Sequence, residues 1–152
     1  MTIQIFTDGS HMKPSDKCGY VVHFPNKEYN DISNPFTLLP KTNQRAELYA
    51  IYKGIKKVHN DDINLDITIY TDSEYSIKSL TLWIKKWKEN NWINTTKKPV
   101  MNQDIIKKID KLMTEHIGKI NFIHVRAHTN KNDYNSIHNQ ITDELAKNGA
   151  MK

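Results

Sequence analysis

The sequence has little of what several classes of protein require. Cys18 is the only cysteine among 152 residues, which excludes an intramolecular disulfide framework and a zinc site built from several thiolates of this chain. No run approaches the roughly 20 consecutive apolar residues that cross a bilayer. The first residues lack the charged start and apolar run of a signal peptide. We therefore expect a cytoplasmic or otherwise intracellular protein without a membrane partner, with a nuclear or viral setting left open.

Internal repeats, low-complexity tracts and linkers are also missing. Hydrophobic residues make up 38% of the chain and recur in short runs, which suffices for a core of ordinary size. A chain of this length normally folds as one unit. We expect a single domain over residues 1–152, acting as a monomer.

Hydrophobic periodicity predicts an α/β fold. Three β-rich runs, 2–7, 18–24 and 27–33, are separated by turn residues and predict a meander of strands. From Asn43 onward the apolar residues take helical spacing, with Thr42 or Asn43 available as the cap. The second half of the sequence predicts a strand at 65–71, helices at 73–80, 81–90 and 101–116, a strand at 119–125 and a last helix at about 135–148. Asn135 or Ser136 would cap the last helix, and Gly149 would stop it.

Because a strand, helix, strand connection normally makes its two strands parallel, these elements form a five-stranded mixed sheet: a three-strand meander plus two parallel strands, flanked by helices. Four acids stand at informative places in it. Asp8 follows the first strand, Glu47 lies early in the first helix, Asp72 follows the fourth strand, and Asp143 lies on the last helix. Taken singly, each has a structural explanation as a turn residue, a helix cap or a solvated helix acid.

The predicted topology brings two of these acids together. Parallel neighbouring strands place the residues after their carboxyl ends at one edge of the sheet, so Asp8 and Asp72 are expected to be neighbours. Adjacent carboxylates repel unless a proton or a cation lies between them, and magnesium prefers such oxygen ligands. A metal site is the natural hypothesis.

Basic charge is concentrated in one segment. Nine lysines and four acids lie between Leu80 and Lys119, so this segment carries the whole net charge of +5. Trp83, Trp87 and Trp92 lie within it. Lysines with interleaved aromatics are typical of a surface that follows a phosphate backbone. A solvated helical face with tryptophans packed beneath it is the other interpretation.

Several blocks, in order along nearly the whole chain, resemble a type 1 ribonuclease H of the bacterial kind. They are Phe-Thr-Asp-Gly-Ser at 6–10, Thr-Asn-Gln-Arg-Ala-Glu-Leu at 42–48, Thr-Asp-Ser-Glu-Tyr at 71–75, the Trp- and Lys-rich stretch from Trp83 through Val100, and Asp-Glu-Leu-Ala at 143–146. No single block is specific, but their order and separations together are. The resemblance implies a ribonuclease H-like fold and a single catalytic domain that cleaves RNA–DNA hybrids.

The same resemblance implies a chemistry for the acids. Asp8, Glu47, Asp72 and Asp143 would bind two Mg²⁺ ions, with Mn²⁺ as a substitute, and hydrolyse the RNA strand endonucleolytically to 5′-phosphate and 3′-hydroxyl ends. One ion would help to deprotonate the attacking water and the other would stabilise the leaving 3′-oxygen. His128 would shuttle a proton or help the product leave. The loop after His128 is longer than usual for this family.

Substrate binding is also implied by the resemblance. Thr42, Asn43 and Gln44 would contact the nucleic-acid backbone near the site, without reading sequence. A protruding handle, about residues 81–99, would grip the DNA strand through Trp83, Lys85, Lys86, Lys88, Lys97 and Lys98. For the tryptophans four apart, Trp83 and Trp87, ring packing within the handle is favoured over base stacking. Where the family often has a glycine-rich turn, this chain reads His-Met-Lys-Pro-Ser-Asp-Lys-Cys at 11–18.

Three alternatives stay open. The chain could be another nuclease of the same superfamily, such as a junction resolvase or an exonuclease, which would share the acidic site but not the handle. It could be a nucleic-acid binding module without activity, although all four acids are present. It could also be a domain cut from a reverse transcriptase, whereas a start at Met1 directly before the first strand favours a free-standing protein.

Overall fold

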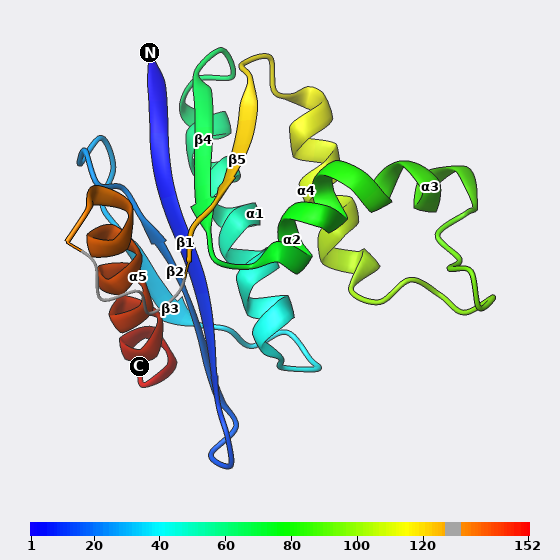
Figure 1. Cartoon of the computed structure of the whole chain (residues 1–152), viewed down its shortest axis with the longest axis horizontal. Coiled ribbons are helices and arrows are strands. Elements are labelled where there is room, and N and C mark those ends of the chain that lie inside the picture. The colour runs from blue at the N-terminus through cyan, green and yellow to red at the C-terminus, as the bar shows by residue number, and fades with distance from the viewer. Residues whose placement is uncertain (127–131) are drawn as a thin grey trace.

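A computed structural model describes residues 1–126 and 132–152. Its centre is a five-stranded sheet in the order β3-β2-β1-β4-β5 (Figure 1). The strands are β1 (Thr2–Met12), β2 (Lys17–His23), β3 (Ile32–Pro35), β4 (Asp66–Thr71) and β5 (Ile120–His124). The first three pair antiparallel, and β4 lies parallel to both β1 and β5. The mixed sheet expected from the sequence is therefore confirmed.

Helices cover both faces of this sheet. They are α1 (Asn43–Asp61), α2 (Glu74–Lys78), a π-helical turn η1 (Ser79–Trp83), α3 (Ile84–Glu89), α4 (Gln103–Glu115) and α5 (Tyr134–Ala150). α2, η1 and α3 follow one another without a break, and the α3 end projects away from the sheet (Figure 1). Within the described ranges, no helix combines the length and the apolar character that crossing a bilayer demands.

Alternation along β1 separates two packed layers. Ile3 and Ile5 are fully buried in the main core, which they share with the apolar residues of α1. Phe6 points to the opposite face, where its ring stacks on Tyr70 with centroids 4.5 Å apart and packs against His138 of α5. Since side chains alternate along a strand, Asp8 projects from the same face as Phe6, the face that α5 covers.

Two strand predictions were wrong in extent. β1 continues five residues beyond Thr7, because β2 pairs with it as far as Met12 opposite Lys17. Asp8 therefore lies inside this strand and not after it. The third strand begins at Ile32 and not at residue 27. Residues before it turn instead, because the carboxylate of Asp31 accepts a hydrogen bond from the backbone N–H of Phe24 and fixes the connection.

The last helix also differs from its prediction at both ends. Asp133 caps it, because its side chain accepts a hydrogen bond from the backbone N–H of Ser136. Gly149 belongs to the final turn and does not stop the helix. A Cβ at Gly149 would lie 3.0 Å from backbone atoms of Asn34. This glycine therefore allows α5 to pack closely on β3.

Candidate metal centre and nucleic-acid interface

The parallel pairing of β1 with β4 places Asp8 beside Asp72. The register aligns Phe6 with Tyr70, so the two acids each stand two residues farther along, still level with each other. Asp8 remains paired with Val21 of β2, whereas β4 has ended at residue 71. The two carboxylates therefore leave adjacent strands at the edge where those strands separate.

Glu47 reaches the same edge because α1 approaches β1 closely at Gly9. A Cβ at Gly9 would lie 2.6 Å from the backbone nitrogen of Glu47 and 2.7 Å from the Cβ of Ala46, closer than a real side chain can come. The start of the helix is set by Thr42, whose hydroxyl accepts a hydrogen bond from the backbone N–H of Arg45. The cap and the glycine together bring Glu47 to Asp8.

Oxygen atoms of Asp8, Glu47 and Asp72 lie within 4.8 Å of one another. Burial raises the pKa of Asp8 well above its ordinary value, and the charges of the other acids raise it further. The backbone N–H of Gly9, which donates to Oδ1 of Asp8 at 2.9 Å, lowers this pKa in part. Burial, and then the charge of Asp72, raise the pKa of Glu47 to about 7. Without a cation, burial and mutual repulsion therefore favour the protonated forms of these two acids.

Asp143 approaches this cluster from α5. Its charge is one of those that raise the pKa of Asp8, so the last helix contributes to the same electrostatic site. Its side chain is 25% exposed, and one carboxylate oxygen lies 3.1 Å from the ammonium of Lys147. His128, the histidine expected to act in catalysis, lies outside the described residues.

The donor set fits a hard divalent cation. Magnesium binds oxygen ligands and keeps several waters, so a site with a few carboxylates and an open side suits it. Three acids from β1, α1 and the end of β4 converge, and their mutual repulsion, which raises the pKa values of Asp8 and Glu47, is what a bound cation would relieve. The residues present are therefore suited to divalent-metal binding.

Polar residues at the start of α1 lie next to a hollow. Thr42, Asn43 and Gln44, expected to contact nucleic acid, line a space of about 450 Å³ together with His11, Lys13 and Lys41. The side-chain oxygen of Asn43 accepts a hydrogen bond from the backbone N–H of His11 at 2.6 Å. Residues 11–18, which stand where the family often has a glycine-rich turn, therefore place His11 and Lys13 beside these polar residues.

In the handle, the three tryptophans pack in series. Ring centroids of Trp83 and Trp87 are 6.0 Å apart, and those of Trp87 and Trp92 are 6.1 Å apart. Trp87 and Trp92 also pack against the main core, whereas Trp83 remains 37% exposed. Ring packing accounts for Trp87, and Trp83 keeps a surface that a ligand can reach.

Around these rings lies a groove of about 550 Å³. Leu82, Trp83 and Ile93 contribute its apolar part, and Lys85 and Lys86 stand at it. The lysines expected to bind nucleic acid, Lys85, Lys86, Lys88, Lys97 and Lys98, are all exposed. One of them already has a partner, because the ammonium of Lys88 lies 2.7 Å from the carboxylate of Asp110.

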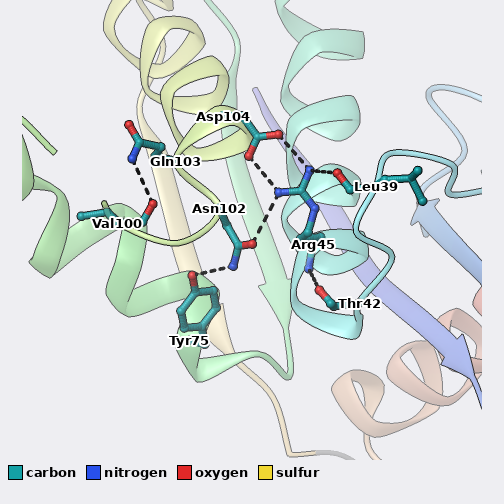
Figure 2. Close-up of polar contacts among 8 residues, drawn as sticks. All are labelled: Leu39, Thr42, Arg45, Tyr75, Val100, Asn102, Gln103 and Asp104. Atoms are coloured by element: carbon teal, nitrogen blue, oxygen red, sulfur yellow. Dashed lines mark hydrogen bonds and ion pairs between the residues drawn. The ribbon is translucent and has the colours of Figure 1, made fainter. Parts of the chain in front are cut away.

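A buried arginine, not anticipated from the sequence, joins the start of α1 to the start of α4, which follows the handle (Figure 2). The guanidinium of Arg45, which is 4% exposed, donates to both carboxylate oxygens of Asp104 at 2.8 Å and to the backbone carbonyl of Leu39 at 3.3 Å. Asn102 lies between this guanidinium and the hydroxyl of Tyr75. An arginine on the apolar face of a predicted helix signals such a buried partner.

The chain is similar to known proteins over almost its full length. Residues 1–151 match the family described as RNase H. It is 36% identical to a ribonuclease H of Schizosaccharomyces pombe over 97% of this chain and 53% of that protein. It is 35% identical to ribonuclease HI of Haemophilus influenzae over 97% of this chain and 89% of that protein. The solution structure of the PFV RNase H domain superposes with a TM-score of 0.72 at 27% identity, over 98% of this chain and 94% of that one.

These matches agree with the resemblance carried by the sequence blocks, although the chain spans only about half the length of the Schizosaccharomyces pombe relative. The sheet order, the convergence of acids and the tryptophan-rich projection lie within the matched range. The chain belongs to the RNase H family.

Proposed function

We propose that this chain hydrolyses the RNA strand of RNA–DNA hybrids, cutting internally and without sequence preference, to leave 5′-phosphate and 3′-hydroxyl ends. The observation that carries this proposal is the convergence of Asp8, Glu47 and Asp72 within 4.8 Å at one edge of the sheet. Family membership and relatives named ribonuclease H support the choice of substrate.

The acids hold the metal in this proposal. Asp8, Glu47, Asp72 and Asp143 would bind two Mg²⁺ ions, with Mn²⁺ able to replace them. When bound, these ions supply Lewis acidity to the attacking water and to the leaving 3′-oxygen. Asp8 would present an oxygen from the sheet. Glu47, whose pKa is raised to about 7 by burial and by Asp72, would hold a proton more readily than an ordinary glutamate and would release it on metal binding. His128 is retained in the proposal as a proton carrier.

Two surfaces would hold the substrate on either side of these acids. Thr42, Asn43 and Gln44 offer hydroxyl and amide groups for the backbone near the cut. On the projecting side, the exposed lysines of the handle would hold the DNA strand by charge, with Trp83 against its sugars or bases. Hybrid geometry, not base sequence, would then select the substrate.

The test compares four labelled substrates: RNA–DNA hybrid, double-stranded RNA, double-stranded DNA and single-stranded RNA, each with Mg²⁺ or with chelator. We expect cleavage of the hybrid's RNA strand alone, and only with metal. Asp72→Asn removes a charge with little change of shape and should lower cleavage at least about 100-fold. Glu115→Gln removes one charge from the exposed end of α4 and should leave the rate unchanged.

Other outcomes would favour other functions. Cleavage of a four-way DNA junction, or digestion from strand ends, would point to another nuclease of this superfamily. Hybrid binding without cleavage in Mg²⁺ or Mn²⁺ would point to a binding module. Wild-type rates in Asp72→Asn would remove this acid from the mechanism.

A further inference from the structure

The two halves of α5 are held to the sheet in different ways. The C-terminal half packs tightly, because a Cβ at Gly19 would lie 2.3 Å from the backbone nitrogen of Ala150 and 2.5 Å from the carbonyl oxygen of Ala146. The N-terminal half has much less apolar burial, since Ile137 is 44% exposed and Ile141 is 37% exposed. Other contacts must therefore hold the half of α5 that precedes Asp143.

A chain of hydrogen bonds from β2 is one of those contacts. Nδ1 of His23, a residue of β2 that is 8% exposed, lies 2.9 Å from a carboxylate oxygen of Asp31. Nε2 of the same ring lies 2.8 Å from Nδ1 of His138 on α5. The two imidazoles also stack, with centroids 5.1 Å apart. The sheet thus reaches α5 through one imidazole-to-imidazole hydrogen bond.

Proton counting shows when this bond exists. The carboxylate of Asp31 only accepts, so Nδ1 of His23 is the donor to it. With both rings neutral, Nδ1 of His138 donates to Nε2 of His23. With one extra proton, Nε2 of His23 becomes the donor and Nδ1 of His138 the acceptor, and the bond survives. With a second extra proton, both facing nitrogens carry hydrogen, so the bond is lost and two cations face each other.

The surrounding groups give little compensation for that second proton. From β1 the neighbours are the ring of Phe6 and the amide of Gln4, which accepts from the hydroxyl of Tyr134 at 2.7 Å. Tyr134 itself lies against His138, with ring centroids 4.5 Å apart. The acids nearby are Asp31, already bonded to His23, and Glu28, whose charge acts on Tyr134. Tyr70 of β4 stacks on Phe6.

We propose that His23 and His138 form a proton-dependent clamp that positions Asp143: the singly bonded pair holds the start of α5 on the sheet, and double protonation releases it. His138 and Asp143 are five residues apart, about 7.5 Å along a helix, so a shift of the helix start moves the carboxylate. Both histidines are positioning residues, and the effect on turnover rests on the function proposed for Asp143.

The direction of the pH effect follows from the environment of the clamp. Burial, and then the neighbouring His23, lower the pKa of His138, while Asp31 raises it in part. Above the ordinary histidine pKa of about 6.5 the clamp is closed. As the pH falls below that value, the unfolded chain binds the proton more readily than the folded one, so the clamp's contribution to stability is lost on the acid side.

The chain offers a matched control for this pair. Nδ1 of His59 in α1 lies 3.0 Å from Nδ1 of His116, again one imidazole against another. His59 lies twelve residues beyond Glu47 on the same helix, about 18 Å along its axis. Substituting His59 therefore removes the same kind of bond at a distance from the carboxylates.

The kinetic experiment compares wild type with His138→Asn, His138→Phe and His59→Asn between pH 5 and 8 in Mg²⁺. Asparagine can replace Nδ1 as a neutral hydrogen-bonding group that does not titrate, whereas phenylalanine keeps ring packing but no bond. We expect the ratio of kcat in His138→Asn to that in wild type to rise several-fold as the pH falls. His138→Phe should lose kcat several-fold at every pH with little change in KM, and His59→Asn should follow wild type throughout.

A second readout separates this clamp from the catalytic assignment. Protection of the amides of residues 134–141 against hydrogen exchange, corrected for the intrinsic exchange rate at each pH and measured without metal or substrate, should fall several-fold on acidification in wild type and not in His138→Asn. Loss of protection there, with a flat kcat ratio, would show that the clamp opens without affecting turnover and would overturn the positioning of Asp143, while leaving the proposed cleavage of hybrids untouched. Equal exchange in the two proteins across the pH range would overturn the clamp itself.

Discussion

Arg45 and Asp104 lie 59 residues apart in the chain, yet their side chains form two parallel hydrogen bonds of 2.8 Å. The guanidinium is buried, with its side chain 5% exposed, whereas the side chain of Asp104 is 58% exposed. In this bidentate ion pair the positive charge of Arg45 lies inside the protein, and the carboxylate of Asp104 at the surface neutralises it. Because Asp104 opens α4, directly after the handle, the pair fixes where the handle returns to the body of the protein.

Asp104→Asn should destabilise the fold. The substitution removes the negative charge that raises the pKa of Arg45 and leaves a buried cation with one hydrogen-bond acceptor fewer. A cost of about 1–2 kcal/mol is expected, below that of a fully buried pair because Asp104 is largely solvated. Urea denaturation at neutral pH measures it. Asp110→Asn, which breaks the ion pair with Lys88, is the control and should cost less than about 1 kcal/mol.

Glu47→Gln should stabilise the metal-free protein at neutral and alkaline pH. The folded pKa of Glu47 is raised to about 7 from 4.5, so the folded protein binds this proton more readily than the unfolded chain does. The wild type therefore loses stability as the pH rises from about 4.5 through 7, whereas the glutamine variant lacks this loss. By pH 8 the variant should be more stable by about 1–3 kcal/mol.

The measurement is thermal or urea unfolding of both proteins in chelator at several pH values. The difference between the two proteins, not either curve alone, isolates this carboxyl group from other titrating groups. Adding Mg²⁺ should reverse the order, because a cation stabilises only the folded protein that binds it. A difference in unfolding free energy between the two proteins that does not vary with pH would show that the pKa of Glu47 is not raised in the folded protein.

The double substitution Lys85→Gln with Lys86→Gln should weaken hybrid binding without changing which substrate is cut. Each phosphate contact contributes about 0.9 to the slope of log affinity against log salt for a B-like duplex, so losing both contacts should flatten that slope by about 2. Binding titrations at salt concentrations between about 50 and 200 mM give this slope. Lys88→Gln is the comparison within the handle: its ammonium is already paired with Asp110, so its loss should flatten the slope by less than the roughly 0.9 of one full contact. An unchanged slope in the double variant would place the DNA strand elsewhere.

Local pattern predicted the elements well where one periodicity dominates. α1 runs from Asn43 with Thr42 as its cap, as the spacing from Leu48 to Val58 indicated. Errors fell where a partner elsewhere decides the extent of an element. β1 is long because β2 pairs with it to Met12, and Gly149 stays helical because β3 needs close packing at that point.

For the site, the sequence identified the candidate acids, and the structure showed that three of them lie close together. The expected neighbours Asp8 and Asp72 follow from parallel strands, a rule that needs only element order. Glu47 joins them because Gly9 lets α1 approach β1 more closely than a residue with a Cβ would allow. The position of Arg45 on the apolar face of its helix signals a buried partner, but nothing in the sequence identifies that partner as Asp104 or Asn102, since the three share no motif.

The sequence by itself determined the alternation of strands and helices, the family and the set of acids, because periodicity, capping and ordered motifs are short-range properties of the chain. Tertiary structure alone decided how close those acids lie, which pKa values burial raises, and that His23 meets His138 across 115 residues. Distance and desolvation depend on what lies around a group in space. No stretch of sequence around Asp8 or His138 contains that information.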